Sequence, residues 1–259
     1  MNSPLLVFTD LDGCLLNKGD YKYDAALPTI DRLRTLEIPL VLCSSKTQAE
    51  MRPLASELNL PWPLVCENGG LIVWDDQQPV TVLGRPRSSI LEVLQTARQA
   101  YRFRSFTDLG EAGLRQVANL PHEKAAPALS RECTEPILWE DAEAKLVDFR
   151  RFLDEAGLSL TQGGRFWHVA GNVNKGDGMA RVVERFSQHA KYGNSCLTVA
   201  IGDSPIDLPM LKLADIPVIV PQPDGATMIS VDDPQCLQAD LPGAAGWAQT
   251  VNRILDNYS

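Results

Sequence analysis

The sequence lacks an excess of basic residues: 24 lysines and arginines stand against 33 aspartates and glutamates, which gives a net charge of −9. Binding to a nucleic-acid backbone needs a basic face, so we expect no nucleic-acid partner. A small anionic substrate remains compatible with this charge, because a local pocket can be basic on an acidic protein.

Long apolar runs and paired cysteines are also missing. No segment approaches the length of a membrane span, and the apolar run near the N-terminus is too short for a signal peptide, so we expect no membrane partner and a cytoplasmic location. The six cysteines are scattered without a C-x-x-C pair. This scatter is typical of reduced free thiols and argues against a zinc site.

What the chain does contain is an alternation of short apolar strands and amphipathic helices. Residues 5–8, 39–43 and 63–66 have the character of buried strands, and residues 25–36 and 47–58 have helical spacing between them. Further strands are predicted at 197–201 and 216–220, with helices at 175–189 and 244–258. This rhythm predicts an α/β fold with a doubly wound, mostly parallel sheet, edged by a hairpin over residues 71–74 and 80–83.

The pattern changes near residue 84. Helices are predicted at 88–101, 122–131 and 142–156, and strands at 135–139, 158–161 and 165–169; residues 103–117 are aromatic and punctuated by glycine. These elements predict an inserted α+β unit with its own small sheet. We therefore expect a core of residues 1–83 and 171–259 and an inserted domain of residues 84–170.

Polar clusters follow three of the predicted core strands. Asp10 and Asp12 end the first strand, Ser44 ends the second, and Asp203 and Asp207 follow the strand at 197–201. Taken alone, Asp10-x-Asp12 is equally typical of a turn that caps a helix. In a doubly wound sheet, however, ligands bind beyond the carboxyl ends of the strands, so these clusters are expected to converge there.

Lys175 opens the helix before the last cluster and completes a set of groups suited to one reaction. The set holds a carboxylate nucleophile, a second carboxylate for proton transfer, a hydroxyl, a cation and a further acid for a metal. These are the groups that phosphoryl transfer through an aspartyl-phosphate requires. Crowded carboxylates also need a compensating cation, and hard oxygen ligands suit Mg²⁺.

At these positions the chain resembles the haloacid dehalogenase-like phosphohydrolases, and the insert is similar to that family's C2-type cap. Within the family it resembles the mannosyl-3-phosphoglycerate phosphatase branch. The motifs that carry the resemblance are Asp10-Leu11-Asp12-Gly13, Cys43-Ser44-Ser45-Lys46-Thr47, Glu67-Asn68-Gly69, Arg131-Glu132-Cys133-Thr134-Glu135-Pro136, Gly164-Arg165-Phe166-Trp167-His168, Asn174-Lys175-Gly176-Asp177 and Gly202-Asp203-Ser204-Pro205-Ile206-Asp207.

The resemblance implies a role for each polar group at the strand ends. Asp10 attacks phosphorus, and Asp12 protonates the leaving alkoxide and then activates water. Ser44 and Lys175 bind the phosphoryl group. The metal site is implied to contain Asp10, Asp12 through its backbone carbonyl, and Asp203, while Asp207 orients Lys175 or a metal-bound water.

Two positions depart from the family's pattern. Ile206 stands where Asn is frequent, so one hydrogen bond near the site is missing. Cys14 stands where Thr or Val is common, and we expect it to be a small packing residue rather than a catalytic thiol. Neither change removes a group that touches the phosphate or the metal.

The substrate implied by the resemblance is a phosphorylated glycerate that bears a sugar. Its carboxylate and hydroxyls call for basic and polar side chains. Besides Ser44, the candidates are Lys46, Arg131, Arg165 and His168, with a solvated surface charge or an ordinary strand residue as the alternative for each.

The predicted function is a Mg²⁺-dependent phosphatase that converts mannosyl-3-phosphoglycerate to mannosylglycerate. Three alternatives remain open: a phosphatase for glucosyl-3-phosphoglycerate or general sugar phosphates, a phosphomannomutase-like phosphotransferase, and a non-catalytic binding module. The sequence does not separate mannose from glucose and does not indicate an oligomeric state.

Overall fold

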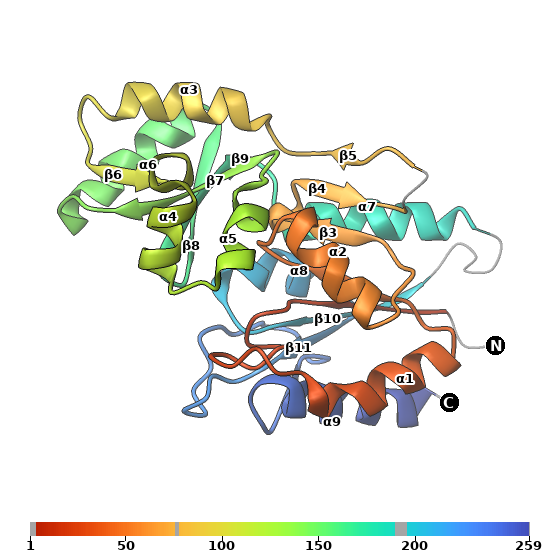
Figure 1. The fold of residues 1–259 in the computed structure, drawn as a ribbon. Coiled ribbons are helices and arrows are strands. Elements are labelled where there is room, and N and C mark those ends of the chain that lie inside the picture. Colours follow the sequence, from red (N-terminus) through yellow and green to blue (C-terminus); the bar gives the residue numbers. More distant parts are fainter. Residues whose placement is uncertain (1–3, 76–77, 190–195, 259) are drawn as a thin grey trace.

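A computed structural model describes residues 4–75, 78–189 and 196–258, and these form two sheets with flanking helices (Figure 1). The larger sheet has eight strands in the order β12-β11-β10-β1-β2-β3-β4-β5. Its parallel strands are β1 (Leu5–Thr9), β2 (Leu40–Cys43), β3 (Leu64–Cys66), β10 (Leu197–Gly202), β11 (Ile216–Ile219) and β12 (Leu237–Gln238). β4 (Leu71–Val73) and β5 (Thr81–Val82) are antiparallel and form the expected hairpin at the edge.

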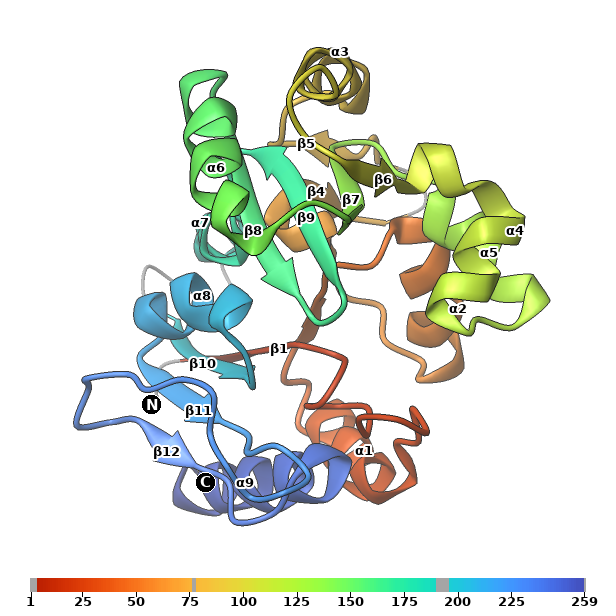
Figure 2. The same cartoon turned by 90° about the vertical axis from the view of Figure 1, so that its left-hand side faces the viewer.

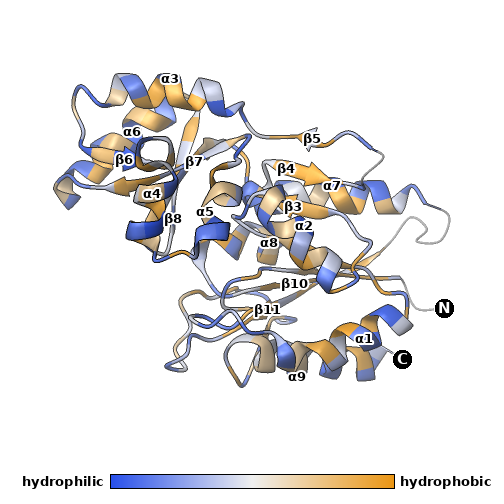
Figure 3. Cartoon of the chain, in the orientation of Figure 1, coloured by the Kyte–Doolittle hydropathy of each residue, from blue (hydrophilic) through white to orange (hydrophobic). Residues whose placement is uncertain are grey.

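Helices cover both faces of the larger sheet, as two apolar clusters show. Leu5 and Val7 of β1 belong to the cluster that includes residues of α1 (Leu27–Thr35), α2 (Gln48–Glu57) and α9 (Gly243–Tyr258). Leu6 and Phe8 belong to the cluster with α7 (Lys175–Ser187) and α8 (Leu208–Leu213). Alternate residues of a strand point to opposite faces, so a strand apolar throughout is buried on both sides. Figure 3 shows the apolar strands between helices that are polar on their outer sides.

The smaller sheet has the order β6-β7-β9-β8, with β6 (Phe103–Ser105), β7 (Thr134–Trp139), β8 (Leu158–Gly163) and β9 (Phe166–Gly171) all antiparallel. α3 (Arg87–Ala97) and α6 (Leu146–Glu155) share one apolar cluster with this sheet. α4 (Phe106–Ala118) and α5 (His122–Leu129) share another. The predicted α/β fold with an inserted α+β unit is confirmed, and we call this unit the cap. The exact domain bounds, 83/84 and 170/171, remain a prediction.

Two cap elements were not predicted from the sequence, namely β6 and α4. Gly110 has a φ of 57° within α4, and helix-breaking glycines weaken the periodic signal. The helix nevertheless begins here, because Ser105 and Asp108 form a capping box in which the side chain of each accepts from the backbone N–H of the other.

Short 3-10 turns lie at several junctions: η1 (Asp24–Ala26), η2 (Glu67–Gly69), η3 (Glu143–Lys145) and η4 (Pro205–Asp207). η2 and η4 follow the carboxyl ends of β3 and β10. Figure 2 shows the β8–β9 hairpin of the cap reaching down toward β1 and β10. The cap therefore faces the edge of the sheet at which the predicted catalytic residues lie. Among the helices of the described residues, none combines the length and apolar character that a membrane crossing requires.

Candidate active site

A buried lysine joins two carboxylates at the carboxyl end of the sheet. The Lys175 ammonium lies 2.6 Å from Asp10 Oδ1 and 2.6 Å from Asp207 Oδ1, and its side chain is 1% exposed. Asp10 directly follows β1, Lys175 is the first residue of α7, and Asp207 ends η4. Three segments far apart in the sequence therefore meet at one point, as the parallel topology requires.

Burial and charge act against each other in this cluster. Burial raises the pKa of Asp10, the ammonium of Lys175 lowers it, and the nearby carboxylates of Asp207 and Asp12 raise it further. Burial disfavours the charge on Lys175, but Asp10 and Asp207 outweigh this effect and raise the lysine's pKa. Lys175 is therefore a fixed positive charge beside the carboxylate predicted to be the nucleophile.

Asp207 has both carboxylate oxygens engaged by the protein. Oδ1 accepts from Lys175, and Oδ2 accepts from the backbone N–H of Asp203 at 3.2 Å and of Ser204 at 3.1 Å, and from the Ser204 hydroxyl at 2.9 Å. This arrangement fixes the position of the lysine ammonium. Its role at a metal, directly or through water, remains a prediction.

A second group of buried acids surrounds the space beside Asp10. Asp10, Cys14 and Asp203 each offer one ligand atom, and these atoms lie within 4.8 Å of one another. Burial raises the pKa of Asp203, opposed by the hydrogen bond from Gln222 Nε2 at 2.9 Å. Burial also raises the pKa of the Cys14 thiol, which lies in the core and stays protonated. Two crowded carboxylates without a thiolate fit a hard divalent cation such as Mg²⁺.

Asp12 and Ser44 lie next to this group and are linked through Lys46. The Lys46 ammonium forms an ion pair with Asp12 Oδ2, while Asp12 Oδ1 is buried and has no hydrogen-bond partner among the described residues. Ser44 is 1% exposed, and its hydroxyl accepts from the backbone N–H of Lys46 at 3.3 Å. Lys46, predicted to bind substrate, is thus positioned to hold the carboxylate of Asp12.

A cavity of about 400 Å³ opens between the larger sheet and the cap. The apolar part of its wall comes from α4, α5 and β9 of the cap, with Phe106, Leu114 and Phe166 among its members. Ser44 and Asp207 lie outside its lining. The predicted residues that line it are Asp10, Asp12, Lys46, Arg131, Arg165, His168, Lys175 and Asp203.

Comparison with known proteins agrees with this geometry. Residues 7–112 match the model of a haloacid dehalogenase-like hydrolase family. Over 97% of its length the chain is 32% identical to a glucosyl-3-phosphoglycerate/mannosyl-3-phosphoglycerate phosphatase of Persephonella marina, covering 97% of that protein. It is 34% identical to the protein of the same name from Methanococcoides burtonii, with 97% and 96% covered. The chain belongs to the haloacid dehalogenase-like hydrolases.

Solved structures share the fold of this haloacid dehalogenase-like hydrolase. A protein of Thermoplasma acidophilum superposes with a TM-score of 0.70 at 16% identity, covering 99% of this chain and 98% of that one. A haloacid dehalogenase-like hydrolase from Bacteroides thetaiotaomicron superposes with a TM-score of 0.68 at 18% identity, covering 97% and 99%. These likenesses extend over the larger sheet and the cap alike.

The two arginines predicted to bind substrate differ in how this hydrolase holds them. Arg131 is buried and donates to the carbonyls of Ala128 at 3.0 Å and Ser45 at 3.2 Å and to the hydroxyl of Thr134 at 2.8 Å. Arg165 lies at the β8–β9 turn, is exposed, and has no hydrogen-bond or ion-pair partner in the described part of the chain. Arg131 therefore presents a fixed charge to the cavity, whereas Arg165 is free to adjust to what binds there.

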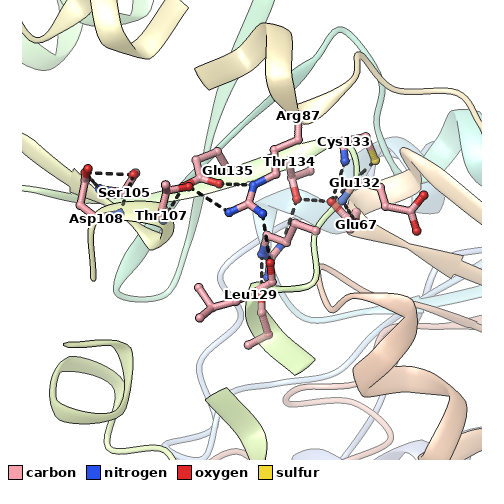
Figure 4. Close-up of polar contacts among 12 residues, drawn as sticks. Glu67, Arg87, Ser105, Thr107, Asp108, Leu129, Glu132, Cys133, Thr134 and Glu135 are labelled. Atoms are coloured by element: carbon pink, nitrogen blue, oxygen red, sulfur yellow. Dashed lines mark hydrogen bonds and ion pairs between the residues drawn. The ribbon is translucent and has the colours of Figure 1, made fainter. Parts of the chain in front are cut away.

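Sequence reasoning missed a buried carboxylate that ties the cap to the larger sheet (Figure 4). Glu67 in η2 is fully buried and accepts from the backbone N–H of Glu132 at 2.8 Å, the N–H of Cys133 at 3.1 Å and the hydroxyl of Thr134 at 2.6 Å. Glu67 and its three partners lie in two of the motifs by which the chain resembles the family, and this resemblance was the signal available in the sequence. We call this set of bonds the Glu67 clamp.

A second network lies on the cap side of the clamp (Figure 4). Arg87 forms an ion pair of 2.7 Å with the buried Glu135 and also donates to the Leu129 carbonyl at 3.1 Å. The other oxygen of Glu135 accepts from the Thr107 N–H at 2.8 Å. These bonds join the starts of α3, α4 and β7, so the segment held by the clamp is itself rigidly attached to the cap.

Substituting Glu67→Gln is expected to lower the free energy of unfolding by about 2 kcal/mol, because an amide donor then faces groups that themselves donate. Urea denaturation measures this change. Glu111→Gln, on an exposed position of α4, is the matched control and should change stability by less than about 0.5 kcal/mol. Equal stability of the two variants would show that the clamp contributes nothing.

His168 is buried and neutral. Burial lowers its pKa from 6.5 to about 3, and the positive charges of Arg131, Lys175 and Lys46 act in the same direction. The unfolded chain therefore binds one more proton than the folded one between these two values, so stability decreases as the pH falls through this window.

Between pH 7 and pH 5, protonation of His168 in the unfolded chain is expected to lower the free energy of unfolding of the wild type by about 2 kcal/mol. A His168→Gln variant should not show this loss. Urea denaturation of both proteins at the two pH values measures the difference. Parallel losses in wild type and variant would mean that His168 takes up a proton in the folded state.

Proposed function

We propose that this protein is a Mg²⁺-dependent phosphatase that hydrolyses mannosyl-3-phosphoglycerate to mannosylglycerate and phosphate. The observation that carries the proposal is the buried Lys175, held 2.6 Å from both Asp10 and Asp207 at the floor of a cavity with basic side chains. A cationic group fixed beside a carboxylate suits attack on a phosphoryl group, because it offsets the negative charge of both partners.

In the proposed reaction, an oxygen of Asp10 attacks phosphorus and the leaving alkoxide departs on the opposite side. Lys175 and Ser44 bind the phosphoryl oxygens, and the start of α7 favours an anion at the same place. Asp12 donates a proton to the leaving oxygen and then takes one from the water that attacks the aspartyl-phosphate. Lys46 holds the Asp12 carboxylate in position for both transfers.

Mg²⁺ would be held by Asp10, Asp203 and the backbone carbonyl of Asp12, where it would neutralise the acids and polarise the phosphate. The close approach of the buried Asp10 and Asp203 carboxylates supports this site. Removal of divalent cations with EDTA is expected to abolish phosphate release, and excess Mg²⁺ should restore it. Full activity after chelation and dialysis would refute a required metal.

The names of the relatives and the arginines of the cavity support a glycosylated phosphoglycerate as the substrate. Both curated relatives are named for glucosyl-3-phosphoglycerate and mannosyl-3-phosphoglycerate together, which supports the glucosyl compound as a second substrate. Arg131 and Arg165 line the cavity and suit the carboxylate of a glycerate. The free thiols of all six cysteines are in keeping with an enzyme that acts in the cytoplasm.

A phosphate-release panel tests this proposal. It compares mannosyl- and glucosyl-3-phosphoglycerate with hexose phosphates and 3-phosphoglycerate, each with Mg²⁺. The highest kcat/KM is expected for a glycosylated phosphoglycerate. A preference for a hexose phosphate would refute the substrate, and retention of phosphate on a sugar bisphosphate would indicate a phosphotransferase.

A further inference from the structure

A smaller cavity of about 230 Å³ lies between the cap and the start of α7. Asn68 from η2 and His168 from β9 line it, and they are 5% and 7% exposed. Asn68 Oδ1 and His168 Nδ1 have no hydrogen-bond partner among the described residues. Unpaired polar atoms in buried positions are costly, so two of them around one cavity indicate that it takes a polar ligand.

This cavity adjoins the active-site cavity. His168, Lys175 and Ile206 line both, so they form the partition between the two spaces. A ligand whose phosphoryl group is bound at Asp10 and Lys175 therefore has two spaces available for the rest of its structure.

The two cavities differ in charge. Lys175 is the one charged residue that lines the smaller cavity, and its charge is matched by Asp10 and Asp207. The rest of its lining is neutral and includes the hydroxyl-bearing Ser159 and Thr161 of β8. The larger cavity is lined by charges of both signs, including Asp10, Asp12, Glu50 and Asp203. Two of its lysines, Lys18 and Lys46, are paired with Asp203 and Asp12, which leaves Arg131 and Arg165 to meet an anionic group. A neutral, hydroxyl-rich group suits the smaller space, and an anionic group suits the larger one.

A glycosylated 3-phosphoglycerate has this branched form, because the carbon next to its phosphorylated carbon carries both a carboxylate and the sugar. We propose that the smaller cavity binds the neutral sugar ring, with Asn68, Thr161 and His168 hydrogen-bonded to its hydroxyls, while the glycerate carboxylate lies in the larger cavity. This inference rests on the proposed function and extends it by naming the residues that recognise the sugar.

The backbone fixes Asn68 firmly beside the reacting groups. Its N–H donates to the Ser44 carbonyl at 2.9 Å, and its φ of 58° lies in the left-handed region that Asn tolerates better than most residues. The next residue, Gly69, lies so close to Asn174 that a Cβ there would come within 2.0 Å of the Asn174 carbonyl oxygen. Asn68 is thus held between the serine and the lysine predicted to bind phosphate.

His168 and Thr161 supply complementary groups from the cap. They are directly opposite each other in the β8–β9 register, so their side chains share the face of the cap sheet that lines the cavity. A neutral imidazole has one donor and one acceptor nitrogen, and a hydroxyl can do both. The site can therefore both donate hydrogen bonds to the hydroxyl groups of a ligand and accept hydrogen bonds from them.

The test compares Asn68→Gly and Thr161→Val with wild type. Glycine accepts the left-handed backbone at position 68, and valine keeps the shape of threonine. The control is Gln162→Ala, which is on the same strand as Thr161 but exposed. For each protein, kcat/KM is measured for mannosyl-3-phosphoglycerate, and 3-phosphoglycerate is measured as a substrate or competing inhibitor. Thermal unfolding reports whether each variant is folded.

Each of the two variants is expected to lose about 5- to 10-fold in kcat/KM for the glycosylated substrate relative to its effect on 3-phosphoglycerate. The loss should come mainly through KM, and Gln162→Ala should match wild type. Equal losses on both compounds, or no loss in Thr161→Val, would overturn the subsite while leaving the phosphatase intact. Wild-type protein that fails to hydrolyse any glycosylated phosphoglycerate would instead overturn the proposed function.

Discussion

Asp10→Asn is expected to reduce phosphate release by about four orders of magnitude or more, because an amide oxygen is a very poor nucleophile toward phosphorus. The substitution nearly preserves the size of the side chain. The variant should remain folded, although Lys175 then faces a neutral amide at position 10 and keeps only its ion pair with Asp207. Steady-state phosphate release measures the loss.

Two further measurements separate loss of the nucleophile from general damage. Acid quenching of wild type during turnover of a radiolabelled substrate should trap label on the protein, whereas Asp10→Asn should trap none. Asp24→Asn, at an exposed position outside the cavity, is the matched control and should behave like wild type. Substantial turnover by Asp10→Asn would remove Asp10 from the role of nucleophile.

Lys175→Met is expected to abolish activity and also to destabilise the fold by about 3 to 5 kcal/mol at pH 8, because it leaves Asp10 and Asp207 buried without their counter-charge. Burial already raises the pKa of Asp10, and loss of the ammonium that opposes this effect raises it further in the folded state. Stability of the variant should therefore fall as the pH rises, and the difference from wild type should grow between pH 5 and pH 8.

Urea denaturation at the two pH values measures this effect. Lys212→Met, an exposed lysine at the end of α8, is the control and should cost less than about 1 kcal/mol at either pH. A loss in Lys175→Met that is the same at pH 5 and pH 8 would mean that the destabilisation comes from packing rather than from unpaired charge.

Much of the fold could be predicted because its core strands are apolar throughout. β1, β2 and β10 lie between two layers of helices, and such burial leaves a clear signature in the sequence. The meeting of Asp10, Lys175 and Asp207 was predictable for a related reason, since the ends of parallel strands and the helices that follow them lie at one edge.

The contacts of the cap with the larger sheet could not be predicted in the same way. The partners of Glu67 are mainly backbone N–H groups 65 and 66 residues away, and any residue except proline supplies such a donor. The helix at residues 106–118 was hidden by Gly110, whose positive φ interrupts it, and the strand before it has only three residues. The dual position of Arg131, bonded to Ser45 and facing the cavity, depends on tertiary packing alone.

The Glu67 clamp constrains how the cap can move. Gly84 and Gly171, at the predicted bounds of the cap, are tightly packed: a Cβ on Gly84 would be 2.9 Å from Cys133 of the clamp, and one on Gly171 would be 2.8 Å from the Arg85 backbone. The bonds of Arg131 to the Ser45 carbonyl and of Thr47 to the Pro127 carbonyl add further links between the cap and the larger sheet. Because the cap is held at several points, it is preorganised over the cavity, and little conformational entropy is lost there when a substrate binds.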